Sequence, residues 1–146
     1  MNTNTVNKNL TKSVISGMVA GLGGGVVFGM MMAMMDMLPM VAGLVGSQSV
    51  LVGGIVHMAI SAVIGAFYGG VLNLGRIQLN WRNALISGML NGVVWWVLGA
   101  LILMPLGLGM TEMLFQIGTT QWLSLMGHLI YGLVTAVVLV LISRRK

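Results

Sequence analysis

Four long apolar stretches dominate the pattern of hydrophobic and polar positions, at about residues 14–38, 50–72, 83–105 and 122–142. Asp36, near the end of the first stretch, is the only charged residue inside these limits. Because an α-helix rises 1.5 Å per residue, about 20 apolar residues cross about 30 Å of hydrocarbon. The stretches are continuous and not alternating, which favours helices over β-barrel strands. The pattern therefore predicts an all-α, integral membrane four-helix bundle.

The composition supports a location in the membrane. Hydrophobic residues make up 58% of the 146 residues and charged residues 6%, with a mean hydropathy of +1.01, whereas soluble domains carry about 25% charged residues. So few polar groups cannot cover a soluble globule, and the remaining apolar surface must face lipid. A cleaved signal peptide is the competing interpretation of the first stretch, but signal cores span only about 7 to 15 residues. The sequence has no cysteine, which excludes disulfides and thiolate metal sites.

The charged residues predict the topology. The connections at residues 39–49 and 106–121 carry no Lys or Arg, and the only acids, Asp36 and Glu112, lie in or beside them. The seven cations all fall on the opposite side of the predicted bundle: Lys8, Lys12, Arg76, Arg82, Arg144, Arg145 and Lys146. Because basic loops stay in the cytoplasm, we expect a multi-pass protein of the cell membrane with both termini cytoplasmic.

Two pairs of matching positions indicate an internal repeat. The string Ile-Ser-Gly-Met at residues 15–18 recurs at residues 86–89, and the only two histidines, His57 and His128, are separated by the same 71 positions. We expect one domain, residues 1–146, built from tandem helical hairpins at about residues 13–73 and 84–143. Since each hairpin crosses the membrane twice, the halves would insert with the same polarity and place both histidines at one depth.

Small residues recur every fourth position along the predicted spans. In membranes, helices associate where small side chains let the backbones approach closely. Each histidine belongs to such a face and should point at a neighbouring helix and away from lipid. We predict helix packing at ten positions: Gly17, Gly21, Gly25, Gly29, Gly53, Ser61, Gly65, Gly88, Gly92 and Gly132.

The intramembrane histidines are the candidate binding residues, and four interpretations stay open. His57 and His128 could ligate a b-type haem, or bind Cu(I) together with the methionines of residues 30–37. They could also be stations of a proton or ion path, with Asp36 or Glu112 at its mouth and an oligomer forming the pore. In the fourth interpretation both imidazoles are neutral and hydrogen-bond across the bundle to Ser61-type hydroxyls, Asn91 or a backbone carbonyl.

Motifs for catalysis are missing from the sequence, so we expect no enzyme and no catalytic residues. A phosphate-binding loop, a nucleophile elbow and an HExxH motif are all absent. The basic residues are too scattered for nucleic-acid binding. We predict a structural or accessory subunit that contacts the lipid bilayer and packs in a homo-oligomer or a larger membrane complex.

The segments around the histidines carry a resemblance to a known group of proteins. Residues 53–70 read GGIVHMAISAVIGAFYGG and residues 127–132 read GHLIYG. Here the chain resembles small bacterial four-span proteins of no assigned activity, in which a Gly-rich, His-containing two-helix unit occurs twice. The resemblance implies the bacterial inner membrane and the four-helix fold, and it brings no functional residues with it.

Overall fold

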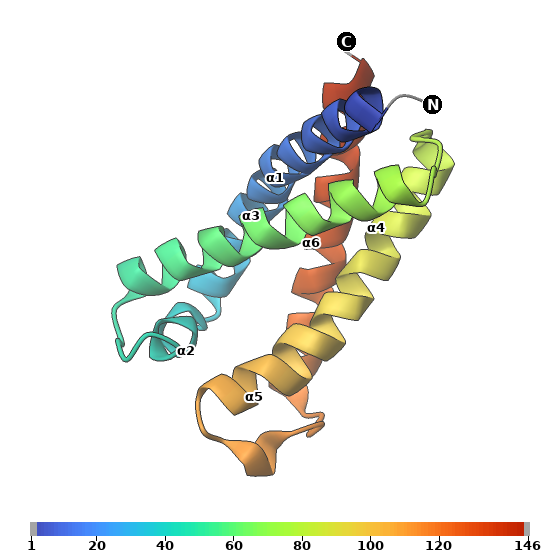
Figure 1. Ribbon diagram of the computed structural model, residues 1–146. Coiled ribbons are helices and arrows are strands. Elements are labelled where there is room, and N and C mark those ends of the chain that lie inside the picture. The colour runs from blue at the N-terminus through green and yellow to red at the C-terminus, as the bar shows by residue number, and fades with distance from the viewer. Residues whose placement is uncertain (1–2, 145–146) are drawn as a thin grey trace.

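The computed structural model describes the backbone of residues 3–144 and the side chains from residue 9 onward. Within these residues the fold is all-α, as predicted, with no strand. The long helices are α1 (Thr3–Met34), α3 (Val50–Leu74), α4 (Trp81–Trp95) and α6 (Thr119–Arg144), and α4 continues into the π-helix η1 (Trp96–Leu103) and the short α5 (Met104–Gly107). The remaining elements are α2 (Leu38–Gly43) and the 3-10 helix η2 (Thr111–Met113) (Figure 1).

The chain is a multi-pass membrane protein by the length and composition of its helices. Four segments of the described residues are long and apolar enough to span a bilayer, with mean hydropathy between 1.8 and 2.4: Asn9–Met34, Val50–Leu74, Trp81–Gly107 and Thr119–Arg144. Among the predicted topological anchors, Arg145, Lys146 and the side chain of Lys8 lie outside the described part.

The first span is shorter at its end than predicted. α1 stops at Met34, before residue 38, because Asp36 takes a left-handed conformation with φ +53°. The Met37 N–H then donates to the Met32 carbonyl over 2.9 Å. This is the 6→1 hydrogen bond of the Schellman motif, which closes many helix C-termini. Pro39 does not mark a helix end. It lies in the first turn of α2, where its missing N–H leaves no bond unmade.

The four long helices form an open arrangement in which α1 and α6 pack together at the centre. α3 packs along α1, and α4 packs along α6. α3 and α4 meet near the connection of residues 75–80 and diverge toward α2 and α5, as Figure 1 shows. We call the end with Arg144 and residues 75–80 the terminal end, and the end with α2 and α5 the hairpin end.

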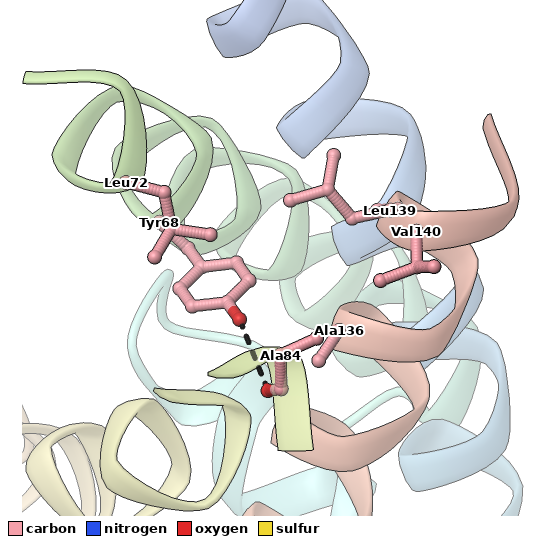
Figure 2. Packing of buried hydrophobic residues seen from close by; sticks show 7 residues of the cluster. Tyr68, Leu72, Ala84, Ala136, Leu139 and Val140 are labelled. Atoms are coloured by element: carbon pink, nitrogen blue, oxygen red, sulfur yellow. Dashed lines mark hydrogen bonds between the residues drawn. The ribbon is translucent and has the colours of Figure 1, made fainter. Parts of the chain in front are cut away.

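A small apolar core holds α3 and α4 together at the terminal end. Figure 2 shows Tyr68 of α3 facing Ala84 of α4, with Leu139 of α6 nearby. The Tyr68 hydroxyl lies 3.5 Å from the Ala84 carbonyl oxygen and 2.7 Å from Ser87 Oγ. The core also includes buried residues of α1, α3 and α6: Ala20, Leu72, Ala136 and Val140. α3 and α4 are thus joined at the terminal end and free to separate beyond it.

The α1–α3 interface has almost no side chains between the two backbones. A Cβ atom at Gly17 would lie 2.9 Å from Gly69 Cα, and one at Gly21 would lie 2.7 Å from Gly65 Cα. These distances are shorter than real Cβ contacts, so only glycine fits. Further along α1, Gly25 faces Ser61 and Gly29 faces the His57 ring, whereas Gly53 of α3 faces the backbone of Leu38 in α2.

The two hairpins do not pack in the register that a 71-residue offset predicts. Gly17 faces Gly65 and Gly69. Gly88 corresponds to Gly17, but it faces Gly132 and Ala136, which correspond to residues 61 and 65. The contact on α6 thus lies one helical turn earlier than the contact on α3. Gly92 shows the same difference. It corresponds to Gly21, which faces Ser61 and Gly65, but it faces the backbone of His128 and Leu129. The duplication itself stays a prediction.

Trp96 gives a physical reason for this difference in register. It stands at the position that corresponds to Gly25, and its ring is too large to lie between two touching backbones. Instead it stacks on Trp122, with centroids 6.2 Å apart, and its Nε1 donates to the Gln121 carbonyl over 2.9 Å. These contacts fasten η1 to the start of α6.

Candidate functional site

The two histidines contact the same aromatic ring. Phe28 of α1 is buried, and its ring makes edge contacts with His57 at 5.4 Å and with His128 at 4.9 Å between centroids. Gly127 of α6 makes room for it, because a Cβ there would lie 2.5 Å from Phe28 Cδ2. The structure thus brings both predicted residues to the inside of the bundle, against one side chain that the sequence pattern did not single out.

The hydrogen bonds of the two imidazoles differ. His57 Nε2 donates to the Gly25 carbonyl of α1 over 3.0 Å, and Ser61 Oγ lies 3.5 Å from the same nitrogen. His128 Nδ1 instead donates to the Ser124 carbonyl of its own helix over 2.8 Å. The cross-bundle bond expected of each histidine is therefore present for His57 and missing for His128. The structure also leaves Asn91 apart from both, with its Nδ2 atom buried and unpaired among the described residues.

Each imidazole keeps one ring nitrogen free of protein partners. No hydrogen bond between described residues engages His57 Nδ1 or His128 Nε2. In a neutral imidazole that donates through one nitrogen, the other carries a lone pair and accepts a hydrogen bond. The site thus offers two acceptor nitrogens to a molecule with a donor group.

Both histidines line one cavity of about 500 Å³ between α3 and the α4–η1 segment. Its walls are mostly aliphatic, aromatic and thioether side chains, and no Lys, Arg, Asp or Glu lines it. Polar atoms come from His57, His128, Gln121, Ser124 and a few neighbours. A volume between about 300 and 1,000 Å³ with apolar walls and few polar groups is typical of small-molecule sites.

Aromatic side chains close the cavity toward the terminal end. Phe67 of α3 and Trp95 of α4 meet edge to face, with centroids 6.0 Å apart. Trp95 lines the cavity, and its Nε1 is buried with no partner in the described part of the chain.

The π-helix η1 supplies the wall opposite α3. Gly99, Ala100 and Leu103 of η1 line the cavity, and a Cβ at Gly99 would meet only His128 Nε2, at 3.9 Å. Pro105 follows directly and cannot donate to the Leu101 carbonyl, which accepts the Phe115 N–H over 3.2 Å instead. Pro105 thus disturbs the α-helical ladder inside the span, which continues to Gly107. The sequence gives no signal for a π-helix here beyond this proline.

A b-type haem between the histidines does not fit this geometry. Two axial imidazoles must face opposite sides of one flat macrocycle. The Phe28 ring packs directly against both imidazoles, and His57 Nε2 and His128 Nδ1 already bond backbone carbonyls. Asp36 and Glu112, the predicted mouth of an ion path, are both exposed and neither lines the cavity.

Methionines give the cavity wall a composition that the sequence analysis did not foresee. Of the methionines between residues 30 and 37, only Met32 and Met37 line the cavity. Four others reach it from α2, α5 and the loop that follows: Met40, Met104, Met110 and Met113. Thioethers are flexible and polarisable, which suits a wall that adapts to varied apolar shapes. No group of three or more His, Asp or Glu side chains comes together to hold a metal within the described residues.

The comparisons with known proteins add no function. No protein-family model matches the chain, and no curated protein and no solved structure shows significant similarity to it. What the protein does is therefore argued from the cavity alone.

Proposed function

We propose that the protein binds an uncharged, lipid-like molecule with a hydroxyl headgroup in the cavity between α3 and η1. The observation that supports this proposal is the meeting of both histidines in one apolar cavity of about 500 Å³ without a charged wall residue. An ionised headgroup would have no counter-charge there, so its burial would be costly. A hydroxyl can donate to the free nitrogen of either imidazole and accept from the Gln121 amide.

Entry from the bilayer follows from the same arrangement. α3 and α4 diverge toward the hairpin end, and the cavity lies between them (Figure 1). An apolar chain can therefore reach the site sideways from lipid while its headgroup stays near the histidines. The methionine wall would adjust to the chain.

A pair of probes with the same chain and different headgroups tests the proposal. Oleyl alcohol is expected to raise the unfolding temperature of the purified protein in mild detergent, because a ligand that binds only the folded state stabilises it. Oleate at the same concentration is expected to give a much smaller shift. No stabilisation by the alcohol, or equal stabilisation by both probes, would contradict the proposal.

Two glycines of this chain supply a matched variant and control. Gly99→Leu adds a side chain that grows into the cavity, whereas Gly54→Leu places the same side chain where nothing lies within 4 Å. We expect Gly99→Leu to abolish the shift with oleyl alcohol and Gly54→Leu to retain it. If oleyl alcohol raised the unfolding temperature of Gly99→Leu as much as that of the unchanged protein, the alcohol would have to bind outside this cavity.

An accessory subunit of an oligomer or larger membrane complex is the second candidate, and the divergence of α3 and α4 favours it. A partner helix could occupy the open flank at which Ile60 and Leu103 line the cavity. A photo-cross-linking residue at position 103 is expected to capture a partner, or a second copy, in native membranes. Elemental analysis of the same purified protein tests the Cu(I) alternative.

A further inference from the structure

A second cavity, of about 340 Å³, lies at the terminal end between α1, α3 and α6. Its lining is unusual for an apolar bundle, because six of its eleven residues carry polar side chains. They are Asn9, Lys12, Ser13, Ser16, Asn73 and Ser143. α1, α3 and α6 thus bring six polar side chains of the described residues to one place at this end.

The charges around this cavity are all of one sign. Among the residues whose side chains the structure describes, Lys12 is the only charged one in its lining. Arg76, Arg82 and Arg144 lie at the same end of the described chain, whereas both acids of the sequence belong to the hairpin end. No carboxylate among the described residues neutralises Lys12. The hydroxyl and amide groups add hydrogen-bond donors, and this combination suits an anion with several oxygen acceptors.

The depth of the cavity matches the headgroup layer of a bilayer. α3 has 25 residues, which makes it about 38 Å long, against about 30 Å of hydrocarbon. Asn73, in the last turn of α3, lines the cavity with Lys12 and stands three residues before Arg76, and charged side chains at the ends of spans stay at the level of the headgroups. The floor of the cavity is formed by Gly69, Leu72 and Leu139, and the last two belong to the terminal-end core.

We propose that this cavity holds a phosphate group, with the Lys12 ammonium as its charge partner and Ser13 and Asn73 as hydrogen-bond donors. The phosphodiester of an anionic phospholipid is the source that lies at this depth. Free inorganic phosphate offers the same oxygens from solution. This site is separate from the cavity of the histidines and does not depend on the function proposed above.

Native mass spectrometry of the full chain tests the proposal. Protein is taken from vesicles of phosphatidylcholine and phosphatidylglycerol, and the phosphatidylglycerol that each chain retains is counted. We expect Lys12→Gln to retain it about ten-fold less tightly, because a hydrogen bond between two charged groups is lost. Adding Asn73→Leu should weaken retention further, and Lys12→Arg should restore most of it.

Arg82→Gln is the matched control, since it removes a cation at the same end that does not line the cavity. It is expected to retain the lipid as the unchanged protein does. An equal loss in Lys12→Gln and Arg82→Gln would overturn the proposal, because general surface charge would then explain retention. Full retention by the double variant would overturn it as well. Circular dichroism confirms that each variant is folded.

A second arm separates the two sources of phosphate. Inorganic phosphate is titrated into protein that carries phosphatidylglycerol, and also into the lipid-depleted protein and its Lys12→Gln variant. Binding that displaces phosphatidylglycerol and depends on Lys12 supports the site and assigns it to free phosphate. Lipid retention without displacement supports the site and assigns it to phospholipid.

Discussion

At the scale of single residues, Phe28 sets the geometry of the histidine cavity. Its ring is in contact with both imidazoles, and Gly127 provides the space it fills. The one ring therefore packs against both of the histidines that line the cavity. A change at this single position should therefore alter both the stability and the shape of the site.

Phe28→Ala is expected to destabilise the protein by about 3 to 5 kcal/mol, because it removes a buried aromatic ring and leaves a void. Titration of a mild-detergent micelle with SDS, followed by circular dichroism, measures the loss. Phe115→Ala, at a phenylalanine that is 61% exposed in a loop, should change stability by no more than about 0.5 kcal/mol. Similar losses in both variants would show that Phe28 is not a packing residue.

The same residue predicts the outcome of haem supplementation. Protein purified from cells supplied with haem should show no Soret band, because Phe28 packs against both imidazoles and His57 Nε2 is already bonded to the Gly25 carbonyl. An absorbance scan is sufficient. A Soret band that His57→Ala and His128→Ala each abolish would refute this geometry.

At the scale of elements, the two helix pairs obtain their contacts in different ways. α1 and α3 touch backbone to backbone through glycines on both sides. α4 and α6 have fewer such positions, and the α4–η1 segment also contacts α6 through the stacked rings of Trp96 and Trp122. At the terminal end, Arg144 lies 5.0 Å above the Trp81 ring, a cation–π contact between the same two helices.

Gly65→Ala is expected to destabilise the α1–α3 pair by about 1 to 3 kcal/mol, the usual cost of overpacking. The added Cβ would lie 2.6 Å from Gly21 Cα, and backbone atoms cannot move aside cheaply. Gly54→Ala on the same helix meets no atom within 4 Å and should be neutral or slightly stabilising. The same SDS titration compares the two, and equal effects would argue against close packing at Gly65.

At the scale of the whole molecule, charge is segregated between the two ends. The described cations lie at the terminal end, and Asp36 and Glu112 lie at the hairpin end. We expect the terminal end to face the cytoplasm, since basic segments are retained there during insertion.

Single-cysteine labelling measures this orientation cleanly, because the chain has no cysteine of its own. Gln48→Cys and Thr111→Cys at the hairpin end should react with a membrane-impermeant maleimide on intact cells. Gln78→Cys at the terminal end should react only after lysis. The reverse pattern would mean that the termini are outside, and labelling of all three on intact cells would contradict four spans.

The sequence predicted the elements well and their mutual placement less well. The spans agree to within a few residues except at α1, where Asp36 ends the helix before Pro39. The repeat anchors led us to expect equivalent histidines, but Trp96 prevents the second pair from packing in the same register. Phe28 and the cavity methionines could not be predicted as cavity residues, because a hydropathy pattern does not distinguish one apolar residue of a membrane span from another.

Hydropathy and charge are properties that each residue carries locally, so the sequence alone determined that the chain forms four apolar helices and which end is basic. The splay between α3 and α4, the cavity that holds both histidines and the polar cavity near Lys12 depend on which side chains meet between helices. Only the tertiary structure decided these, because glycine contacts and one bulky ring set the helix registers across distant parts of the chain.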